Sequence, residues 1–294
     1  MYPILSATRG RSGIAVLARV DGRVRTWSLE PLRELVEFQT IFGGVLGRLA
    51  VATTPDRDMV AAAASWRGAV AGYDARSGER LWERRDFREI RHLAAASGGR
   101  HFTASFDRGP MQILDVHSGE TIASVRGIRA VYAGSHAALA VVAYDGRVAL
   151  GHLDPWRFRA RLDLAGFGVL DAEFGSDVVL VSVVQDPDEG PSSVYQLSTD
   201  GAVMWRYESP PRWNVPWLGR DQRSGHWLGV EHDPEQSVEP GLIRWSDDGT
   251  VTSRHRLPGA ADFAFVSEGR RLIATPGIVL DTATGDMVER FDAG

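Results

Sequence analysis

A repeat with a period of about 42 residues runs through the whole chain, and it limits the possible folds more than any other feature of the sequence. The 294 residues divide into seven copies with an average length of 42. The clearest copies read VAGYDARSGERLW, MQILDVHSGETIASV and GIVLDTATGDMVERF. Each joins two β-rich runs through a polar turn that ends in glycine, which is the signal of a β-hairpin. We therefore expect one structural unit repeated along the chain rather than two unrelated domains.

A second turn lies upstream of each hairpin and is marked by one glycine per copy. These glycines are Gly22, Gly68, Gly109, Gly146, Gly190, Gly241 and Gly277. Glycine suits such turns because tight hairpins need a positive φ, which other residues adopt only at a cost. Two more strand-like runs precede each of these glycines, so the sequence predicts four strands per copy.

Four short antiparallel strands in a unit of this length are typical of a β-propeller blade, which buries its apolar faces against neighbouring blades. Uninterrupted apolar runs such as VVLVSVV fit strands that are covered on both faces. The sequence therefore predicts a single all-β domain, a seven-bladed β-propeller with four antiparallel strands per blade. The expected blades are 1–42, 43–86, 87–127, 128–165, 166–209, 210–258 and 259–294.

The two ends of the chain each contribute a complete blade in this prediction. The first blade begins with its own innermost run, PILSATR, and the last blade ends with its own outermost run, MVERFDAG. We therefore expect no strand to be exchanged between the first and last blades. Side-chain packing alone would close such a ring.

The composition excludes several kinds of chemistry. The chain has no Cys, so it can form no disulfide, thiolate nucleophile or Cys-ligated metal site. All 33 basic residues are Arg, which excludes Schiff-base chemistry and the lysine of a P-loop. The net charge of −5 is unlike that of a nucleic-acid binder, and no apolar run is long enough to cross a membrane. We expect a cytoplasmic protein with no cofactor, no bound metal and no nucleic-acid partner.

The spacing from Gly78 to Trp82, repeated from Gly201 to Trp205, resembles a motif of the WD-repeat and quinoprotein-like (PQQ-like repeat) propellers. In quinoprotein blades this tryptophan lies on the outer strand and packs onto the next blade. The resemblance covers the whole chain at the level of fold. It implies a propeller but no specific activity, because the sequence has neither the WD dipeptide nor an identifiable set of cofactor ligands.

Two loops between the second and third strands of their blades are longer than the fold requires. They are QDPDEGPSS at 185–193 and EHDPEQSVEPG at 231–241, on adjacent blades and on the same rim as the connection ESPPRWNVPWLG. Long loops on one face of a repeat protein often mark its binding face. The candidate binding residues of this rim are Asp186, Asp188, Glu189, Trp213, Trp217, Glu231, Asp233, Glu235 and Glu239.

These residues have a functional and a structural interpretation. The functional one is a docking surface for an Arg- or Lys-rich protein or peptide, with charge complementarity from the carboxylates and apolar area from the tryptophans. A weak Ca²⁺ site is a lesser alternative, because Asp186 and Asp188 lack the remaining ligands of an EF-hand. The structural interpretation is a pair of solvated loops, with both tryptophans packed under the loop or between blades 5 and 6.

An enzyme would place its acid and base groups at the mouth of the central channel, where the innermost strands converge. The candidates are Asp171, Glu173, Asp262 and His92. Paired carboxylates could serve a hydrolase, lyase or isomerase, or could simply line a water-filled channel. A quinone-dependent dehydrogenase is a weaker alternative.

The leading hypothesis from the sequence is a non-catalytic propeller that binds a protein or peptide on the acidic rim. It rests on the long loops, the carboxylates and the tryptophans that share this rim. The sequence names neither the partner nor the oligomeric state.

Overall fold

The structure is a computed structural model, and its regular elements are β-strands. It describes residues 4–7, 14–18, 21–29, 31–43, 46–64, 68–87, 90–96, 99–106, 110–126, 130–133, 139–144, 147–153, 156–162, 164, 168–184, 191–233, 239–258, 262–266, 269–275 and 277–291. Within this part of the chain no helix has the length and apolar character needed to span a membrane.

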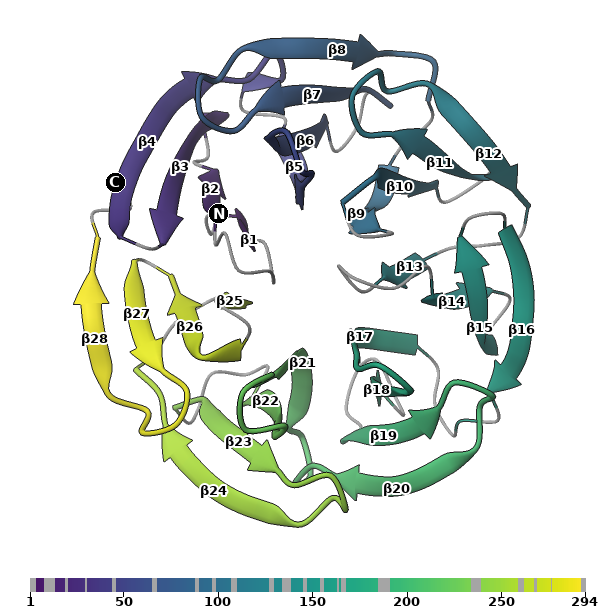
Figure 1. Cartoon of the computed structure of the whole chain (residues 1–294), viewed down its shortest axis with the longest axis vertical. Coiled ribbons are helices and arrows are strands. Elements are labelled where there is room, and N and C mark those ends of the chain that lie inside the picture. Colours follow the sequence, from purple (N-terminus) through teal and green to yellow (C-terminus); the bar gives the residue numbers. More distant parts are fainter. Residues whose placement is uncertain are drawn as a thin grey trace.

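The described strands form seven four-stranded antiparallel sheets arranged as a ring (Figure 1), which we number 1 to 7 in chain order. Sheets 1 to 4 contain β1 (Ile4–Ala7), β2 (Ile14–Ala18), β3 (Arg23–Leu29), β4 (Leu32–Gln39), β5 (Leu46–Thr53), β6 (Asp58–Ala64), β7 (Val70–Asp74), β8 (Arg80–Arg84), β9 (Ile90–Ala96), β10 (His101–Phe106), β11 (Met111–Asp115), β12 (Thr121–Val125), β13 (Ala130–Ala133), β14 (Leu139–Tyr144), β15 (Arg147–Leu153) and β16 (Trp156–Leu162).

Sheets 5 to 7 complete the ring in the same way, with the first strand of each sheet nearest the centre (Figure 1). They contain β17 (Gly168–Phe174), β18 (Val178–Val184), β19 (Ser192–Ser198), β20 (Val203–Glu208), β21 (Asn214–Arg220), β22 (Trp227–His232), β23 (Gly241–Trp245), β24 (Val251–Arg256), β25 (Phe263–Val266), β26 (Arg271–Ala274), β27 (Ile278–Asp281) and β28 (Met287–Arg290). Each repeat expected from the sequence contains the four strands of one sheet, and the all-β propeller is confirmed.

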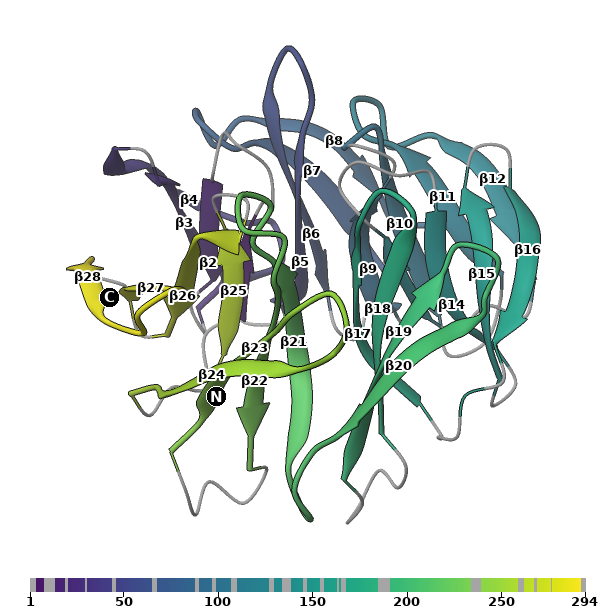
Figure 2. The ribbon, with the colours of Figure 1, turned by 60° about the horizontal axis from the view of Figure 1, so that its bottom comes forward.

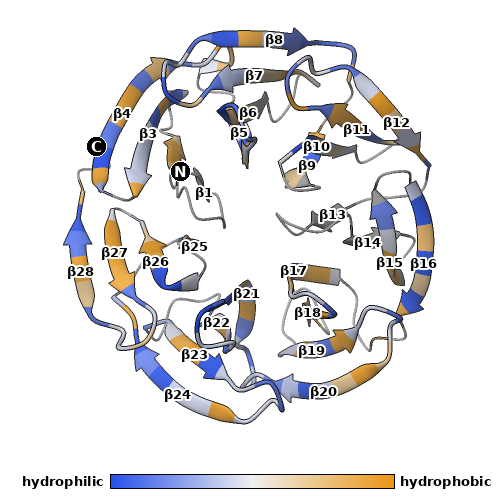
Figure 3. Ribbon diagram, in the orientation of Figure 1, coloured by the Kyte–Doolittle hydropathy of each residue, from blue (hydrophilic) through white to orange (hydrophobic). Residues whose placement is uncertain are grey.

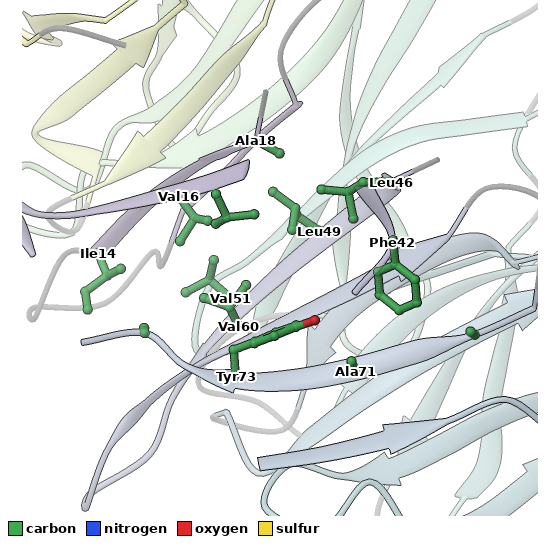
Figure 4. Packing of buried hydrophobic residues seen from close by; sticks show 13 residues of the cluster. Ile14, Val16, Ala18, Phe42, Leu46, Leu49, Val51, Val60, Ala71 and Tyr73 are labelled. Carbon is green, nitrogen blue, oxygen red and sulfur yellow. The ribbon is translucent and has the colours of Figure 1, made fainter. Parts of the chain in front are cut away.

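The hydrophobic core lies between neighbouring sheets. Figure 4 shows the seam between sheets 1 and 2, where Ile14 and Val16 of β2 pack with Val51, Val60 and Tyr73 of sheet 2. The second strand of a sheet is covered on both faces, and β10 is accordingly buried along its whole length. The outermost strands carry hydrophilic and apolar residues side by side (Figure 3), because only one of their faces is covered.

The polar turn of the repeat motif is organised by the aspartate that opens it. In sheet 3, Oδ1 of Asp115 accepts hydrogen bonds from the backbone N–H groups of His117 (3.0 Å) and Ser118 (2.9 Å). Gly119 then reverses the chain with a φ of 70°. The side chain of Asp115 thus replaces backbone partners inside the turn, which explains why Asp, Ser and Gly recur at this spacing.

In the described sheets, each outermost strand contains one extra residue that interrupts its pairing with the third strand. The extra residues are Leu35, Leu81, Ile122, Arg159, Met204, Thr252 and Val288. Such a β-bulge bends the strand, increases its twist and makes its free edge a poorer template for another strand. The sequence repeat therefore includes a repeated backbone irregularity.

The side chain just after the bulge packs on the next sheet. Trp82 of β8 donates a hydrogen bond from Nε1 to the carbonyl oxygen of Val116 in sheet 3 (2.9 Å), and its ring lies against Gly119. Trp205 of β20 donates in the same way to the carbonyl oxygen of Asp247 in sheet 6 (3.0 Å). The docking of both tryptophans on the next repeat is confirmed.

Other seams use smaller side chains at the same place. In these seams, a residue one or three positions after the bulge contacts the glycine in the turn of the next sheet. Phe38 contacts Gly78, and His255 contacts Gly285. Gly201 is contacted by both Ala160 and Leu162. Between the last and first sheets, the ring of Phe291 lies 4.8 Å from that of Trp27. Phe291 follows Val288 by three residues, so this contact matches the others in position.

Replacing Gly119 by Ala should destabilise the protein more than replacing Gly43 by Ala. Both glycines have a positive φ, but a Cβ on Gly119 would lie 2.5 Å from Trp82, whereas a Cβ on Gly43 meets nothing within 4 Å. We expect a loss of roughly 1 kcal/mol for Gly43→Ala from backbone strain alone, and at least about 2 kcal/mol for Gly119→Ala. Urea denaturation measures both, and equal losses would contradict the proposed role of the docked tryptophan.

Deleting residues 287–294 should leave a collapsed ring. Sheet 1 contains only β1–β4 and sheet 7 only β25–β28, so the deletion removes the outer strand and Phe291 but no hydrogen-bonded partner of β1. Ala15, Val266 and Ile273 still pack across the seam. Hydrogen exchange of the β1 amides tests this expectation, because an exchanged-strand closure would lose their protection on truncation.

Candidate functional site

The rim with the long loops is built by three neighbouring connections of sheets 5 and 6 (Figure 2), which run from β18 to β19, from β20 to β21 and from β22 to β23. The first and third loops are longer than their equivalents elsewhere: β18 ends at Val184 and β19 begins at Ser192, whereas β14 ends at Tyr144 and β15 begins at Arg147. The central parts of both loops lie outside the described residues. Four candidate residues fall there, namely Asp186, Asp188, Glu189 and Glu235.

Two of the remaining carboxylates are buried, and their expected place on an exposed rim is therefore corrected. Glu231 and Asp233 are each 4% exposed. The reason lies in the length of β22, which continues through His232 and pairs Glu231 with Gly241, so that Glu231 is a strand residue rather than a loop residue. Glu239 is exposed, as the sequence suggested.

Glu231 belongs to a polar cluster between sheets 5 and 6. The hydroxyl of Tyr207 donates to Oε1 of Glu231 (2.5 Å), and the guanidinium of Arg254 donates to the Tyr207 oxygen (2.6 Å) while lying 3.7 Å from the same carboxylate. Burial, reinforced by the hydrogen bond to Glu231, raises the pKa of Tyr207. The carboxylate is thus used to link two sheets.

The two tryptophans of the rim are half-buried. The ring of Trp217 lies 5.6 Å from that of His232 in sheet 6 and 5.0 Å from that of Phe263 in sheet 7. Its Nε1 donates to Oδ1 of Asp262 (3.0 Å). Trp217 therefore packs between sheets 6 and 7, in line with the structural interpretation, although the seam is one further along than the sequence suggested.

The β20–β21 connection, which carries Trp213, is held in a single conformation by serine side chains. Oγ of Ser209 donates to the carbonyl oxygen of Trp213 (2.5 Å) and lies 3.1 Å from that of Ser192. Oγ of Ser192 accepts from the backbone N–H of Val215 (2.9 Å). These bonds join the connection to the first residue of β19, directly beside the β18–β19 loop.

Arg212 stands at the tip of this connection with a φ of 68°, and it is the one non-glycine residue of the described chain with a positive φ. Such a backbone conformation costs an ordinary residue on the order of 1 kcal/mol and persists only where the surroundings impose it. Arg212 and the neighbouring Pro211 are both exposed. Apart from the run Ser-Pro-Pro, nothing in the amino-acid sequence indicates this strained turn.

The four channel candidates lie on three different sheets, and the structure does not bring them together. His92 is on β9 of sheet 3, Asp171 and Glu173 are on β17 of sheet 5, and Asp262 directly precedes β25 of sheet 7 (Figure 1). Glu173 is buried. No group of three or more His, Cys, Asp or Glu side chains among the described residues could hold a metal ion.

Two of these carboxylates already accept hydrogen bonds from protein groups. Asp171 accepts from the backbone N–H groups of Ala172 (2.8 Å) and of Leu218 in sheet 6 (2.8 Å). Asp262 accepts from the N–H of Phe263 (3.0 Å) in addition to the indole of Trp217. Each carboxylate thus connects neighbouring sheets, as Glu231 does.

His92 is half-buried near the centre of the ring. Burial, with a smaller contribution from the positive charge of Arg48, lowers its pKa to about 4. The imidazole is therefore neutral at neutral pH. A group with so low a pKa is poorly matched to general acid catalysis at that pH.

The arginines around the β8–β9 connection are paired with acids. Arg84 donates from Nε to Oδ1 of Asp86 (2.8 Å), and Arg85 forms an ion pair with Glu83.

No protein-family model matches the chain, and no curated protein matches it in sequence. Among solved structures, the β-propeller domain of Cps50 (Swd1) from Myceliophteria thermophila is similar with a TM-score of 0.68 and 11% identity, over 98% of this chain and 97% of that chain. The computationally designed protein Ika8 is similar with a TM-score of 0.62 and 14% identity, over 99% and 88%.

BamB from Moraxella catarrhalis is a third similar structure, with a TM-score of 0.57 and 15% identity over 95% of this chain and 79% of that chain. At such low identities these likenesses show the fold alone. They agree with the β-propeller fold and assign no activity or partner.

Acid should destabilise the protein in part through His92. Because the folded-state pKa of His92 is about 4 and its unfolded value about 6.5, the unfolded chain takes up a proton first as the pH falls. The free energy of unfolding should therefore decrease between about pH 6.5 and 4, with a slope from this group of at most about 1.4 kcal/mol per pH unit. Urea denaturation of His92→Gln across this range should show a shallower decrease; an unchanged pH profile would contradict the assignment.

Proposed function

We propose that this chain is a non-catalytic scaffold that binds an Arg- or Lys-rich segment of a protein partner. The binding surface would be the rim formed by the β18–β19, β20–β21 and β22–β23 connections, which we call the acidic rim. The observation that carries the proposal is the β20–β21 turn, where Arg212 has a φ of 68° and the carbonyl oxygen of the neighbouring Trp213 accepts a hydrogen bond from Ser209. Backbone strain of this kind is concentrated at binding and catalytic sites.

A rigid turn between acidic loops suits the capture of an extended basic segment. The turn presents Pro211 and the half-buried Trp213 in fixed positions, so little conformational entropy is lost when they are covered. Glu208, which directly precedes the turn, and Glu239 are exposed, and the segments 185–190 and 234–238 add the carboxylates of Asp186, Asp188, Glu189 and Glu235. Glu231 and Asp233 are buried and take no part in this surface.

A scaffold also accounts better than an enzyme for the state of the channel residues. Asp171 and Asp262 accept hydrogen bonds that hold neighbouring sheets together, and His92 is neutral on a third sheet.

Reversing the charge of the acidic rim should weaken the binding of a basic probe. The variant combines four substitutions: Asp186→Arg, Asp188→Arg, Glu235→Arg and Glu239→Arg. Because the rim then repels the probe instead of attracting it, we expect the Kd for fluorescein-labelled oligo-arginine to rise at least about tenfold. Fluorescence anisotropy at near-physiological salt measures the change. The melting temperature should stay within a few degrees, because Glu239 is exposed and the other three lie in loops between strands.

The matched control reverses four exposed acids elsewhere, in Glu79→Arg, Glu120→Arg, Asp286→Arg, Glu289→Arg. The first three of these residues lie in or beside the hairpin turns of the repeat, and Glu289 lies on β28. The control changes the net charge by the same amount and should leave binding within about threefold of the wild type. If probe binding were equally weakened in both variants, the effect would be due to overall net charge alone, and the proposal would be overturned.

A further inference from the structure

A second surface lies on the outside of the ring, on β16 of sheet 4. The strand reads WRFRARL and contains three arginines and no acid. Arg157, Arg159 and Arg161 are all exposed, and Phe158 between them is 54% exposed. The ring of Phe158 stands edge-on to that of the half-buried Trp156 at 5.4 Å. We call Trp156, Arg157, Phe158, Arg159 and Arg161 the β16 patch.

The arginines of the β16 patch form no ion pair with a carboxylate in the described part of the chain. The guanidinium of Arg159 lies 3.2 Å from Nε2 of His152 and donates to Oγ1 of Thr199 in sheet 5 (3.3 Å). Its charge also adds to the lowering of the pKa of Asp200, which is caused mainly by the hydrogen bond from Ser198. These neighbours position Arg159 but do not neutralise it.

Several arginines on the other outermost strands are paired with acids. On β20, Arg206 pairs with Glu208, and on β8, Arg80 lies 2.9 Å from Glu83. On β24, Arg254 pairs with the buried Glu231. The concentration of unpaired positive charge on β16 is therefore not a general property of the outer strands.

Protection of a sheet edge does not explain the β16 patch. Charged residues on an edge strand commonly prevent its pairing with strands of other molecules. Every described outer strand, however, already has a bulge that disrupts such pairing. In β16 the bulged residue is Arg159 itself. An exposed phenylalanine works against such protection. Exposed arginine beside aromatic side chains is instead the composition of interface hot spots.

The distribution of charge around the ring favours an acidic protein segment as the ligand. Residues 1–165, which form sheets 1 to 4, carry 23 Arg and 17 acids, whereas residues 166–294 carry 10 Arg and 21 acids. A long polyanion such as a nucleic acid would be repelled by the acidic sheets 5 to 7, whereas a short acidic segment meets only the local positive field. Guanidinium groups bind carboxylates in bidentate fashion, and Phe158 suits apolar residues placed between them.

We propose that the β16 patch is a second docking surface, which binds an acidic segment with interspersed apolar side chains from a protein partner. Recognition occurs through the side chains of the patch, because the bulge at Arg159 interrupts the regular edge that strand addition requires. This surface is separate from the acidic rim and takes a ligand of the opposite charge. It does not depend on the proposed function.

Binding of a fluorescein-labelled peptide of Glu-Glu-Leu repeats tests the proposal. In Arg157→Glu, Arg159→Glu, Arg161→Glu we expect the Kd to rise at least about tenfold. The milder pair Arg157→Gln, Arg161→Gln leaves the contacts of Arg159 in place and should give about a threefold rise. Phe158→Ser, which changes no charge, should also weaken binding. Circular dichroism and melting temperature confirm that each variant is folded.

The control variant reverses three exposed arginines on other outer strands, in Arg33→Glu, Arg256→Glu, Arg290→Glu. It should bind the peptide as the wild type does. The variant with the charge-reversed acidic rim should also bind the peptide as the wild type does, and this result distinguishes the two proposed surfaces. Equal weakening in the control, or no weakening in the triple variant, would overturn the docking surface. Tighter binding of single-stranded DNA than of the peptide, lost in the triple variant, would overturn the assignment of an acidic protein segment.

Discussion

In the described part of the chain, five of the outermost strands contact a turn of the next sheet, and these contacts help to hold the ring together. A bulge twists the outer strand, and the residues after the bulge then face the turn between the third and fourth strands of the neighbour. Trp82 and Trp205 make this contact with a large ring and an indole hydrogen bond, whereas Phe38 and His255 make it with smaller side chains. Because a single sheet cannot cover its own faces, these contacts and the apolar seams inside them stabilise the whole fold.

The need of each sheet to pack against its neighbours also determines the contacts of several polar residues. Asp171, Glu231 and Asp262 looked like groups available for chemistry or binding, but each accepts hydrogen bonds that connect two sheets. Seven similar seams offer many places where a carboxylate can satisfy an N–H or O–H group of the neighbour. The side chains that are free for a partner must therefore be sought on the loops and the outer strands.

The uneven distribution of charge along the sequence produces an uneven distribution of charge around the ring, because successive repeats form neighbouring sheets. The excess of arginine in the first four sheets and the excess of acids in the last three place the two proposed surfaces in regions of opposite charge. The acidic rim lies on sheets 5 and 6, and the β16 patch lies on the adjoining sheet 4 (Figure 1). A partner with both acidic and basic segments would be oriented by this arrangement.

The sequence by itself determined the propeller and its four-stranded units, because these depend on local patterns of alternation and turn residues. The docking of Trp82 and Trp205 was implied by the resemblance of the Gly-to-Trp spacing to that of quinoprotein blades. It also located the long loops. Only the tertiary structure decided that Glu231 and Asp233 are buried, that Trp217 packs on sheet 7 and that Asp171 and Asp262 accept hydrogen bonds from the neighbouring sheet. The physical reason is that these properties depend on side chains of the neighbouring sheet, and the sequence pattern of one repeat does not show which of those side chains it will contact.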